Sequence, residues 1–182
     1  MGKIEIRRYK DGDENEICDV VKKAVLSENI KDYPKTAIEH LVESHNADLI
    51  KRRAKAFHVY VLTDEDKIIG VGMIGPYWDS LTESSFFTIF LDPQYKGTGL
   101  GRKIIETLEN DEYFLRAKRV EIPASITACE FYKKMGYSYK NGIDVMDKEH
   151  VDLVILDIMM PRMDGYEFTK TLRECDNNLP IL

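Results

Sequence analysis

The stretch Leu91-Asp-Pro-Gln-Tyr-Lys-Gly-Thr-Gly-Leu-Gly-Arg102 decides the fold, because it predicts a strand that ends in a glycine-rich turn and runs into a helix. Glycine lets the main chain adopt positive φ and approach a ligand closely. The free amide hydrogens of the helix's first turn, together with the helix dipole, favour an anion such as a diphosphate. Lys96 and Arg102 add positive charge to this segment.

Two common phosphate loops do not fit the same segment. The Walker loop needs Gly-x4-Gly-Lys-Ser/Thr, which the sequence lacks, and the dinucleotide fingerprint needs Gly-x-Gly-x-x-Gly. Here the spacing is Gly97-x-Gly99-x-Gly101. A glycine-rich turn without a ligand therefore remains the alternative interpretation when the segment is taken alone.

Hydrophobic periodicity along the chain predicts strands and helices in mixed order. Strands are expected at residues 4–8, 57–62, 67–74, 84–91, 119–122 and from 137 onward. Helices are expected after a cap at Asp13, from Pro34, over 47–55, after Gly101 and over 127–135, and Gly75-Pro76 is expected to end the third strand. This order indicates an α/β or α+β fold, with a sheet covered by helices.

Composition narrows the class of protein and its partners. The 182 residues carry a net charge of -6, and no basic block is longer than Lys51-Arg52-Arg53, so we expect no nucleic-acid partner. The three cysteines and four histidines show no disulfide or metal-site spacing, so no metal is expected. The polar N-terminus and the absence of a long apolar run predict a cytoplasmic protein without a membrane partner.

Two signatures together resemble the GNAT N-acetyltransferases. Lys96-Gly-Thr-Gly-Leu-Gly101 is similar to the family's acetyl-CoA loop, Arg/Gln-x-x-Gly-x-Gly/Ala, with Lys in place of Arg or Gln. Phe131-Tyr-Lys-Lys-Met-Gly-Tyr137 is similar to its second signature, Phe-Tyr-x-x-x-Gly-Phe/Tyr. The resemblance covers residues 1–143 and implies a mixed, mostly antiparallel central sheet flanked by helices.

The resemblance also implies acetyl-CoA as cofactor and a set of residues that hold it. The main chain of Ile89 and Leu91 would bind the pantetheine arm, and Tyr132 would protonate the departing thiolate. Ser125 stands where many members have an Asn that contacts the cofactor, which is a departure from the pattern. The remaining cofactor-binding residues are expected in the loop, at Lys96, Gly97, Thr98, Gly99, Leu100, Gly101 and Arg102.

The implied reaction is direct attack of a primary amine, from a small molecule or a peptide, on the thioester. The amine must lose a proton, and Glu83 is the first candidate for the acceptor, with Glu121 second. Each could instead be a solvated charge, and His58 could accept a proton or be structural. The aromatic residues that could line an acceptor pocket, or belong to the core, are Tyr33, Tyr77, Trp78 and Phe86.

The tail has a different resemblance. Residues 144–182 are similar to the middle of a response-regulator receiver domain, with Asp157 at the phosphoacceptor position. Its Mg²⁺-binding acidic pair and its later hydroxyl and lysine have no counterpart here, so we expect Asp157 to be a vestige. Val151 to Leu156 is expected to pair into the acetyltransferase sheet, followed by a helix and a short strand; a disordered or domain-swapped tail is the alternative.

Alternatives to an enzyme also remain open from the sequence. The chain could be a non-catalytic acyl-CoA-binding module, or a signalling protein in which the receiver-like tail regulates the transferase. A homodimer is left open as well.

Overall fold

The computed structural model describes residues 2–138, and the chain divides into two compact units, Met1–Thr127 and Ala128–Leu182. The first unit holds a five-stranded sheet in the order β1-β2-β3-β4-β5. Its strands are β1 (Ile4–Arg8), β2 (His58–Asp64), β3 (Lys67–Pro76), β4 (Glu83–Leu91) and β5 (Arg119–Glu121). Neighbouring strands pair antiparallel except β4 and β5, which are parallel. The predicted mixed, mostly antiparallel sheet is confirmed.

Helices flank this sheet on both faces. The α-helices of the first unit are α1 (Glu14–Ser27), α2 (Lys35–Ser44), α3 (Ala47–Ala56), α4 (Leu100–Glu109) and α5 (Glu112–Leu115). Short 3-10 turns lie at η1 (Asn29–Lys31), η2 (Tyr77–Asp79), η3 (Pro93–Tyr95) and η4 (Ile126–Ala128), and α6 (Cys129–Lys134) belongs to the second unit. Neither α5 nor the 3-10 turns were predicted, because such short elements leave no periodic pattern in the sequence.

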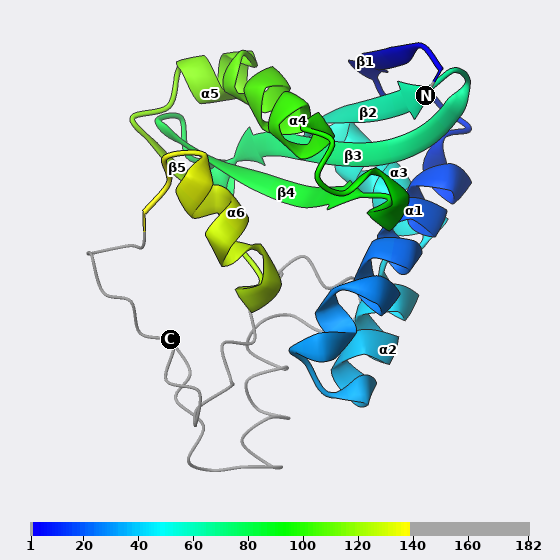
Figure 1. Cartoon of the computed structure of the whole chain (residues 1–182). Coiled ribbons are helices and arrows are strands. Elements are labelled where there is room, and N and C mark those ends of the chain that lie inside the picture. Colours follow the sequence, from blue (N-terminus) through cyan, green and yellow to red (C-terminus); the bar gives the residue numbers. More distant parts are fainter. Residues whose placement is uncertain (1, 139–182) are drawn as a thin grey trace, which may run out of the picture. The chain divides into compact units, whose positions relative to one another are not determined.

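The hydrophobic core of the first unit has two layers, one on each face of the sheet. Figure 1 shows α1 and α3 on one face, and α4 and α5 on the other. On the α1 face the apolar side of the helix packs against β3 and β4, which is the pattern of an amphipathic helix on a sheet. The buried residues of this layer include Ile17, Val21, Val59, Val61, Val71 and Met73.

On the opposite face, α4 lies unusually close to β3 because β3 carries two glycines there. A Cβ at Gly72 would lie 2.6 Å from Ile104 Cγ2 and 3.2 Å from Leu108 Cδ1. A Cβ at Gly70 would lie 3.0 Å from Ile104 Cδ1. The missing side chains therefore let Ile104 and Leu108, both buried, rest directly on the β3 main chain.

Two local predictions were wrong. Asp13 occupies the N-cap position of α1, but its carboxylate accepts from the Arg7 guanidinium (2.7 and 2.9 Å) and from the Lys10 amide instead of capping the first turn. Gly75-Pro76 does not interrupt β3, because both residues pair with β4 and proline is tolerated at a strand end. Gly75 is needed there, since a Cβ would meet the Phe57 ring at 2.2 Å.

Other predicted boundaries shift slightly. Pro34 caps α2 instead of occupying its first turn, and β5 ends at Glu121. The helix expected over 127–135 divides into η4 and α6, and Tyr137 and Ser138 are not in a strand. The predicted pairing of residues 151–156 with the sheet, and Asp157, lie outside the described residues.

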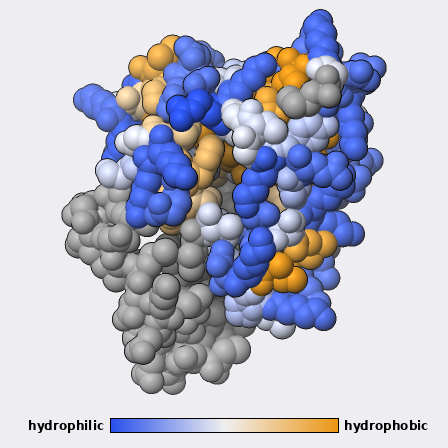
Figure 2. Space-filling view, viewed as in Figure 1, coloured by the Kyte–Doolittle hydropathy of each residue, from blue (hydrophilic) through white to orange (hydrophobic). Residues whose placement is uncertain are grey.

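Figure 2 shows a mostly hydrophilic face with small, separate hydrophobic patches. Five large apolar side chains are exposed in the described residues: Leu26, Ile30, Trp78, Leu81 and Leu115. No helix within residues 2–138 is long and apolar enough to cross a bilayer.

The close packing of α4 on β3 generates a stability prediction. We expect Gly72→Ala to lower the free energy of unfolding by about 1–3 kcal/mol, because the added methyl overlaps the branched Ile104 side chain. Gly70→Ala should cost less, since its nearest contact is the mobile end of Ile104. Urea titration measures both; equal stability of Gly72→Ala and the parent protein would contradict this account.

Candidate active site

The sheet has an open edge where β4 outruns β5. The two strands pair only at Glu83↔Arg119, Ser84↔Val120 and Ser85↔Glu121. β5 then ends, while β4 continues to Leu91 (Figure 1). In the described part of the chain, the second half of β4 therefore has a strand partner on the β3 side alone.

The direction of the main chain along this edge follows from one hydrogen bond. The Asp92 amide donates to Ile69 O at 2.7 Å, so the main-chain amide of Asp92 points towards β3. Because main-chain groups alternate sides along a strand, those of Leu91 and Ile89 point away from β3. These are the two residues predicted to bind a pantetheine arm, and the geometry leaves their main-chain groups directed at the open edge.

A β-bulge precedes these residues. Met73 pairs with Phe87 and Val71 with Phe90, so Gly72 alone faces Thr88 and Ile89. Thr88 has φ 46°, a left-handed conformation that a β-branched residue rarely adopts. The Arg53 guanidinium, from α3, donates a hydrogen bond to Thr88 Oγ1. The sequence offered no signal for this contact.

The glycine-rich turn ends at the N-terminus of α4. Gly97 and Gly99 have φ 78° and 84°, and a Cβ at either would meet no atom within 4 Å. Gly99 is the N-cap of α4, and no side chain caps this end. The Lys103 amide makes the first helical bond, to Gly99 O, while the amides of the first three helical residues have no acceptor among residues 2–138. Uncapped amides at a helix start are an arrangement that favours an anion.

The turn is fixed to its surroundings on both sides. The Tyr95 hydroxyl donates to Asp64 at 2.8 Å, and the Asp92 carboxylate accepts from the Gln94 amide and pairs with Lys23 at 3.2 Å. Lys96 pairs with Glu28 and lowers the pKa of that carboxyl. Of the two cations predicted in the turn, Arg102 is exposed on the first turn of α4 and Lys96 turns towards α1.

The family model of the acetyltransferase (GNAT) domain matches residues 29–154, more than half of the chain. The chain belongs to the GNAT acetyltransferase family. The open edge of β4 and the uncapped turn before α4 both lie within the residues that the family model matches.

Solved GNAT structures share the fold at low sequence identity. A GCN5-related N-acetyltransferase from Rhodopseudomonas palustris superposes with a TM-score of 0.64 and is 20% identical, covering 79% of this chain and 91% of that one. An N-acetyltransferase named PaiA from Thermoplasma acidophilum, in complex with coenzyme A, has a TM-score of 0.62 and 13% identity, covering 76% and 90%. Such identities show the fold alone.

The C-terminal part matches a second family model. The response-regulator receiver domain model matches residues 130–182, which overlaps the GNAT match over 130–154. Response regulator MprA of Mycolicibacterium vanbaalenii is 33% identical over 67 residues, 37% of this chain. Sensor histidine kinase RcsC of Escherichia coli is 39% identical over 54 residues. The chain spans 29% of that regulator and 6% of that kinase.

The two candidate bases of this GNAT chain lie together at the paired end of β4 and β5. Arg119 bridges them, donating to Glu83 at 2.9 and 3.2 Å and pairing with Glu121 at 2.9 Å. The hydrogen bond with Glu83 is the main reason that the pKa of Arg119 is raised. Tyr77 donates to Glu121 at 3.3 Å, and Arg119 lies over its ring. Both carboxylates therefore share one cation.

The other predicted pocket residues divide between core and surface. Phe86 is buried and stacks on Phe114 in the α5 layer, which agrees with the alternative that it belongs to the core. Tyr33 packs against the core on the α1 face, and Trp78 is 62% exposed. His58 is structural: its Nδ1 lies 2.7 Å from the buried Asp111 carboxylate, which also caps α5.

Tyr132 and Ser125 complete the predicted set. Tyr132 lies in α6 of the second unit, is buried, and has Phe131 and Tyr137 rings edge-on at 5.2 and 6.1 Å. Burial raises the pKa of its hydroxyl, so the group keeps its proton. Ser125 is half-buried between β5 and η4. The roles of both residues stay predictions.

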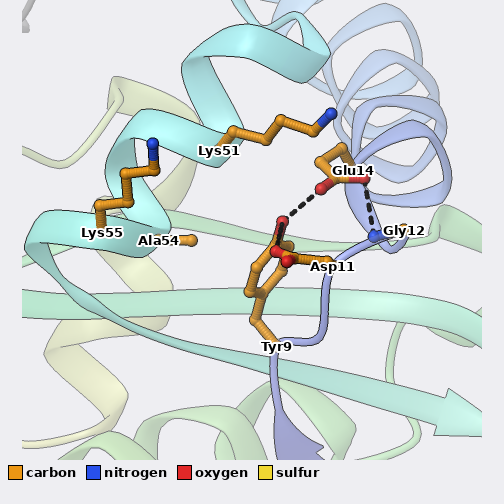
Figure 3. Close-up of a pocket in the computed structure, with 7 residues that line it drawn as sticks. All are labelled: Tyr9, Asp11, Gly12, Glu14, Lys51, Ala54 and Lys55. Carbon is orange, nitrogen blue, oxygen red and sulfur yellow. Dashed lines mark hydrogen bonds between the residues drawn. The ribbon is translucent and has the colours of Figure 1, made fainter.

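A separate hollow lies between α3 and the turn that joins β1 to α1. Figure 3 shows Tyr9 and Glu14 facing each other there, with Lys51 and Lys55 on the α3 side. The Gly12 amide also donates to Glu14 at 3.0 Å, and the Glu14 carboxylate is buried. None of the predicted cofactor-binding residues lines this hollow.

The α1 face also holds a buried histidine next to β4. His45 ends α2, its Nδ1 lies 2.9 Å from Leu41 O, and its ring meets Phe90 edge-on at 6.0 Å. Burial, and then the charge of Arg53, lower the pKa of His45 to about 4. Since the unfolded chain binds the proton near its ordinary pKa of 6.5, protonation favours unfolding.

This histidine predicts an acid-sensitive stability. The contribution of neutral His45 is complete above pH 6.5 and is lost as pH falls towards 4, by at most about 3 kcal/mol. His45→Asn, which can still donate to Leu41 O, should therefore flatten the loss of stability over this range. Urea titrations at several pH values test this against the exposed His40→Asn. Parallel curves for His45→Asn and the parent protein would contradict the prediction.

Proposed function

We propose that this GNAT chain transfers the acetyl group of acetyl-CoA to a primary amine of a small molecule or peptide. The observation that carries the proposal is the uncapped N-terminus of α4 beside the open edge of β4. An anion-binding turn and a strand edge with free main-chain groups are the two features that a diphosphate linked to an amide-bearing arm requires.

The residues present fit coenzyme A. The space beside Gly97 and Gly99 is open, and the first turn of α4 carries no acidic residue. The nearby carboxylates of Asp92 and Glu28 are each paired with a lysine. The coenzyme A complex of the Thermoplasma relative supports the same cofactor class.

Each part of the chain then has a distinct task. Bound acetyl-CoA supplies an acetyl group activated as a thioester. The amides of Gly97, Gly99 and Gly101 hold the diphosphate, and the main chain of Ile89 and Leu91 orients the arm along the open edge. Tyr132 holds a proton on its hydroxyl oxygen, which it gives to the departing sulfur, while Ser125 donates a hydrogen bond to the cofactor.

The acceptor amine must be neutral when it attacks. Glu83 is the proposed proton acceptor and Glu121 the second candidate, acting directly or through water. Arg119 partly neutralises both carboxylates. The Tyr77 hydroxyl fixes one oxygen of Glu121 and leaves the carboxylate pair in a defined position.

Calorimetry with coenzyme A, followed by thiol release from acetyl-CoA with a panel of amines, tests the proposal. Binding together with amine-dependent thiol release supports the transferase. Binding without turnover on any amine would favour the acyl-CoA-binding module instead. Absence of binding would overturn both.

The turn before α4 generates a matched prediction. Gly97→Asp places a negative charge where the diphosphate would lie and should weaken coenzyme A binding by roughly tenfold or more. Gly12→Asp is the control, because Gly12 also has positive φ (106°) and open space, in the β1–α1 turn. Titration calorimetry gives the dissociation constants; equal values for both variants would argue against this location of the diphosphate.

Tyr132 generates a second prediction. Tyr132→Phe removes the proposed proton donor and keeps the buried ring, so kcat should fall about a hundredfold while the dissociation constant of acetyl-CoA stays unchanged. Because burial raises the pKa of Tyr132, the parent enzyme should lose no activity at the pH where an ordinary tyrosine ionises. Steady-state kinetics over a pH series checks both statements, and an unchanged kcat would remove Tyr132 from the mechanism.

A further inference from the structure

Thr88 is held in a conformation that its own chemistry disfavours. Its φ of 46° lies in the left-handed region, where a β-branched side chain clashes with its own main chain. Such a conformation is strained and persists only when its surroundings hold it. The bulge that contains Thr88 therefore needs a cause outside the strand itself.

A side chain of α3 contacts Thr88 and can hold this conformation. Arg53 lies in the last turn of α3, is 2% exposed, and donates from Nη1 to Thr88 Oγ1, 35 residues along the chain. The helix end favours a cation at this position, because its carbonyls carry partial negative charge. The Phe57 amide closes the helix on Arg53 O at 2.7 Å, which fixes the main chain of Arg53.

Burying a guanidinium is costly. Burial lowers the pKa of Arg53 to about 10, with a smaller contribution from Arg52. An apolar residue of similar length would avoid this cost, and such replacements are often neutral or stabilising in protein cores. A buried Arg on α3 is therefore better explained by what it holds in place than by its contribution to stability.

Arg53 contacts the β4 bulge, where the open edge of the sheet begins. The bulge inserts one extra residue into β4, and one residue more or less reverses which side of a strand each main-chain group faces. With the bulge, Ile89 and Leu91 point away from β3. If Thr88 relaxed into the β region and the bulge were lost, these two residues would turn towards β3.

We propose that Arg53 is a positioning residue for acyl transfer, which holds Thr88 in the left-handed conformation and so directs the main chain of Ile89 and Leu91 at the cofactor. The inference rests on the proposed function. Arg53 acts through Thr88 and through the bulge, with no contact to the reacting atoms required.

The test separates cofactor binding from folding. Arg53→Met should keep the thermal midpoint within a few degrees of the parent, because its chain fills similar space without a buried charge. Its dissociation constant for coenzyme A should rise roughly tenfold or more, with a matching rise in KM for acetyl-CoA. Arg52→Met, on the exposed side of the same helix, is the matched control and should bind as the parent does.

A rescue experiment distinguishes positioning from simple packing. Glycine adopts positive φ without strain, so Thr88→Gly should restore part of the coenzyme A affinity lost in Arg53→Met. Thr88→Ser retains the hydroxyl that accepts from Arg53 and should bind more tightly than Thr88→Ala, which lacks it. A purely space-filling role for Arg53 predicts no rescue and no difference between Ser and Ala.

The outcomes separate this inference from the proposed function. If the parent protein binds coenzyme A and Arg53→Met binds equally well, the inference is wrong and the transferase assignment stands. If the parent protein fails to bind, both fall. If Arg53→Met does not fold, the Thr88 variants decide: equal affinity of Thr88→Ser and Thr88→Ala overturns the inference, and weaker binding by Thr88→Ala alone supports it.

Discussion

The early end of the pairing between β4 and β5 is the constraint on which the rest of the site depends. Three residue pairs join these parallel strands, and β4 then runs on to Leu91 with its outer edge open in the described part of the chain. An unpaired strand edge is ordinarily a liability in a folded protein, because it invites pairing with another chain. Here the edge leads directly into the uncapped start of α4, so the proposed function uses the same exposed main-chain groups for an extended ligand.

Two further features make this edge specific. The bulge at Thr88 determines which main-chain groups of β4 face outward. The glycine-rich turn then follows the end of β4 and leads into the N-terminus of α4. The Arg53 contact links the bulge to α3, on the face of the sheet opposite α4. The open edge of β4 is therefore supported from both faces of the sheet, although the groups that it exposes are main-chain atoms.

Much of this could be predicted from the sequence, and the exceptions have physical causes. The turn from Gly97 to Gly101 and the alternating strands were recognisable because glycine placement and period-two burial are local signals. The bulge at Thr88 was not recognisable, because the sequence Phe87-Thr-Ile-Phe90 is typical of an uninterrupted strand. The side chain that contacts the bulge is Arg53, which is distant along the chain.

The predicted Asp13 cap was wrong for a related reason. The Arg7 guanidinium donates two hydrogen bonds to the Asp13 carboxylate, and the sequence of the helix start alone does not indicate this contact. The roles of Glu83 and Glu121 as proton acceptors stay predictions, and the sequence did not indicate that both carboxylates pair with Arg119.

The turn before α4 is anchored at Asp92 and Tyr95 on one side, and α4 itself rests on the bare main chain of Gly70 and Gly72. Loops that order themselves only when a ligand arrives spend part of the interaction energy on lost conformational entropy. In this protein the turn before α4 is already ordered in the folded chain, so that entropy is lost during folding and not on binding. An anion that binds to the amides at the start of α4 would therefore meet dipoles that are already ordered, and little further entropy would be lost on binding.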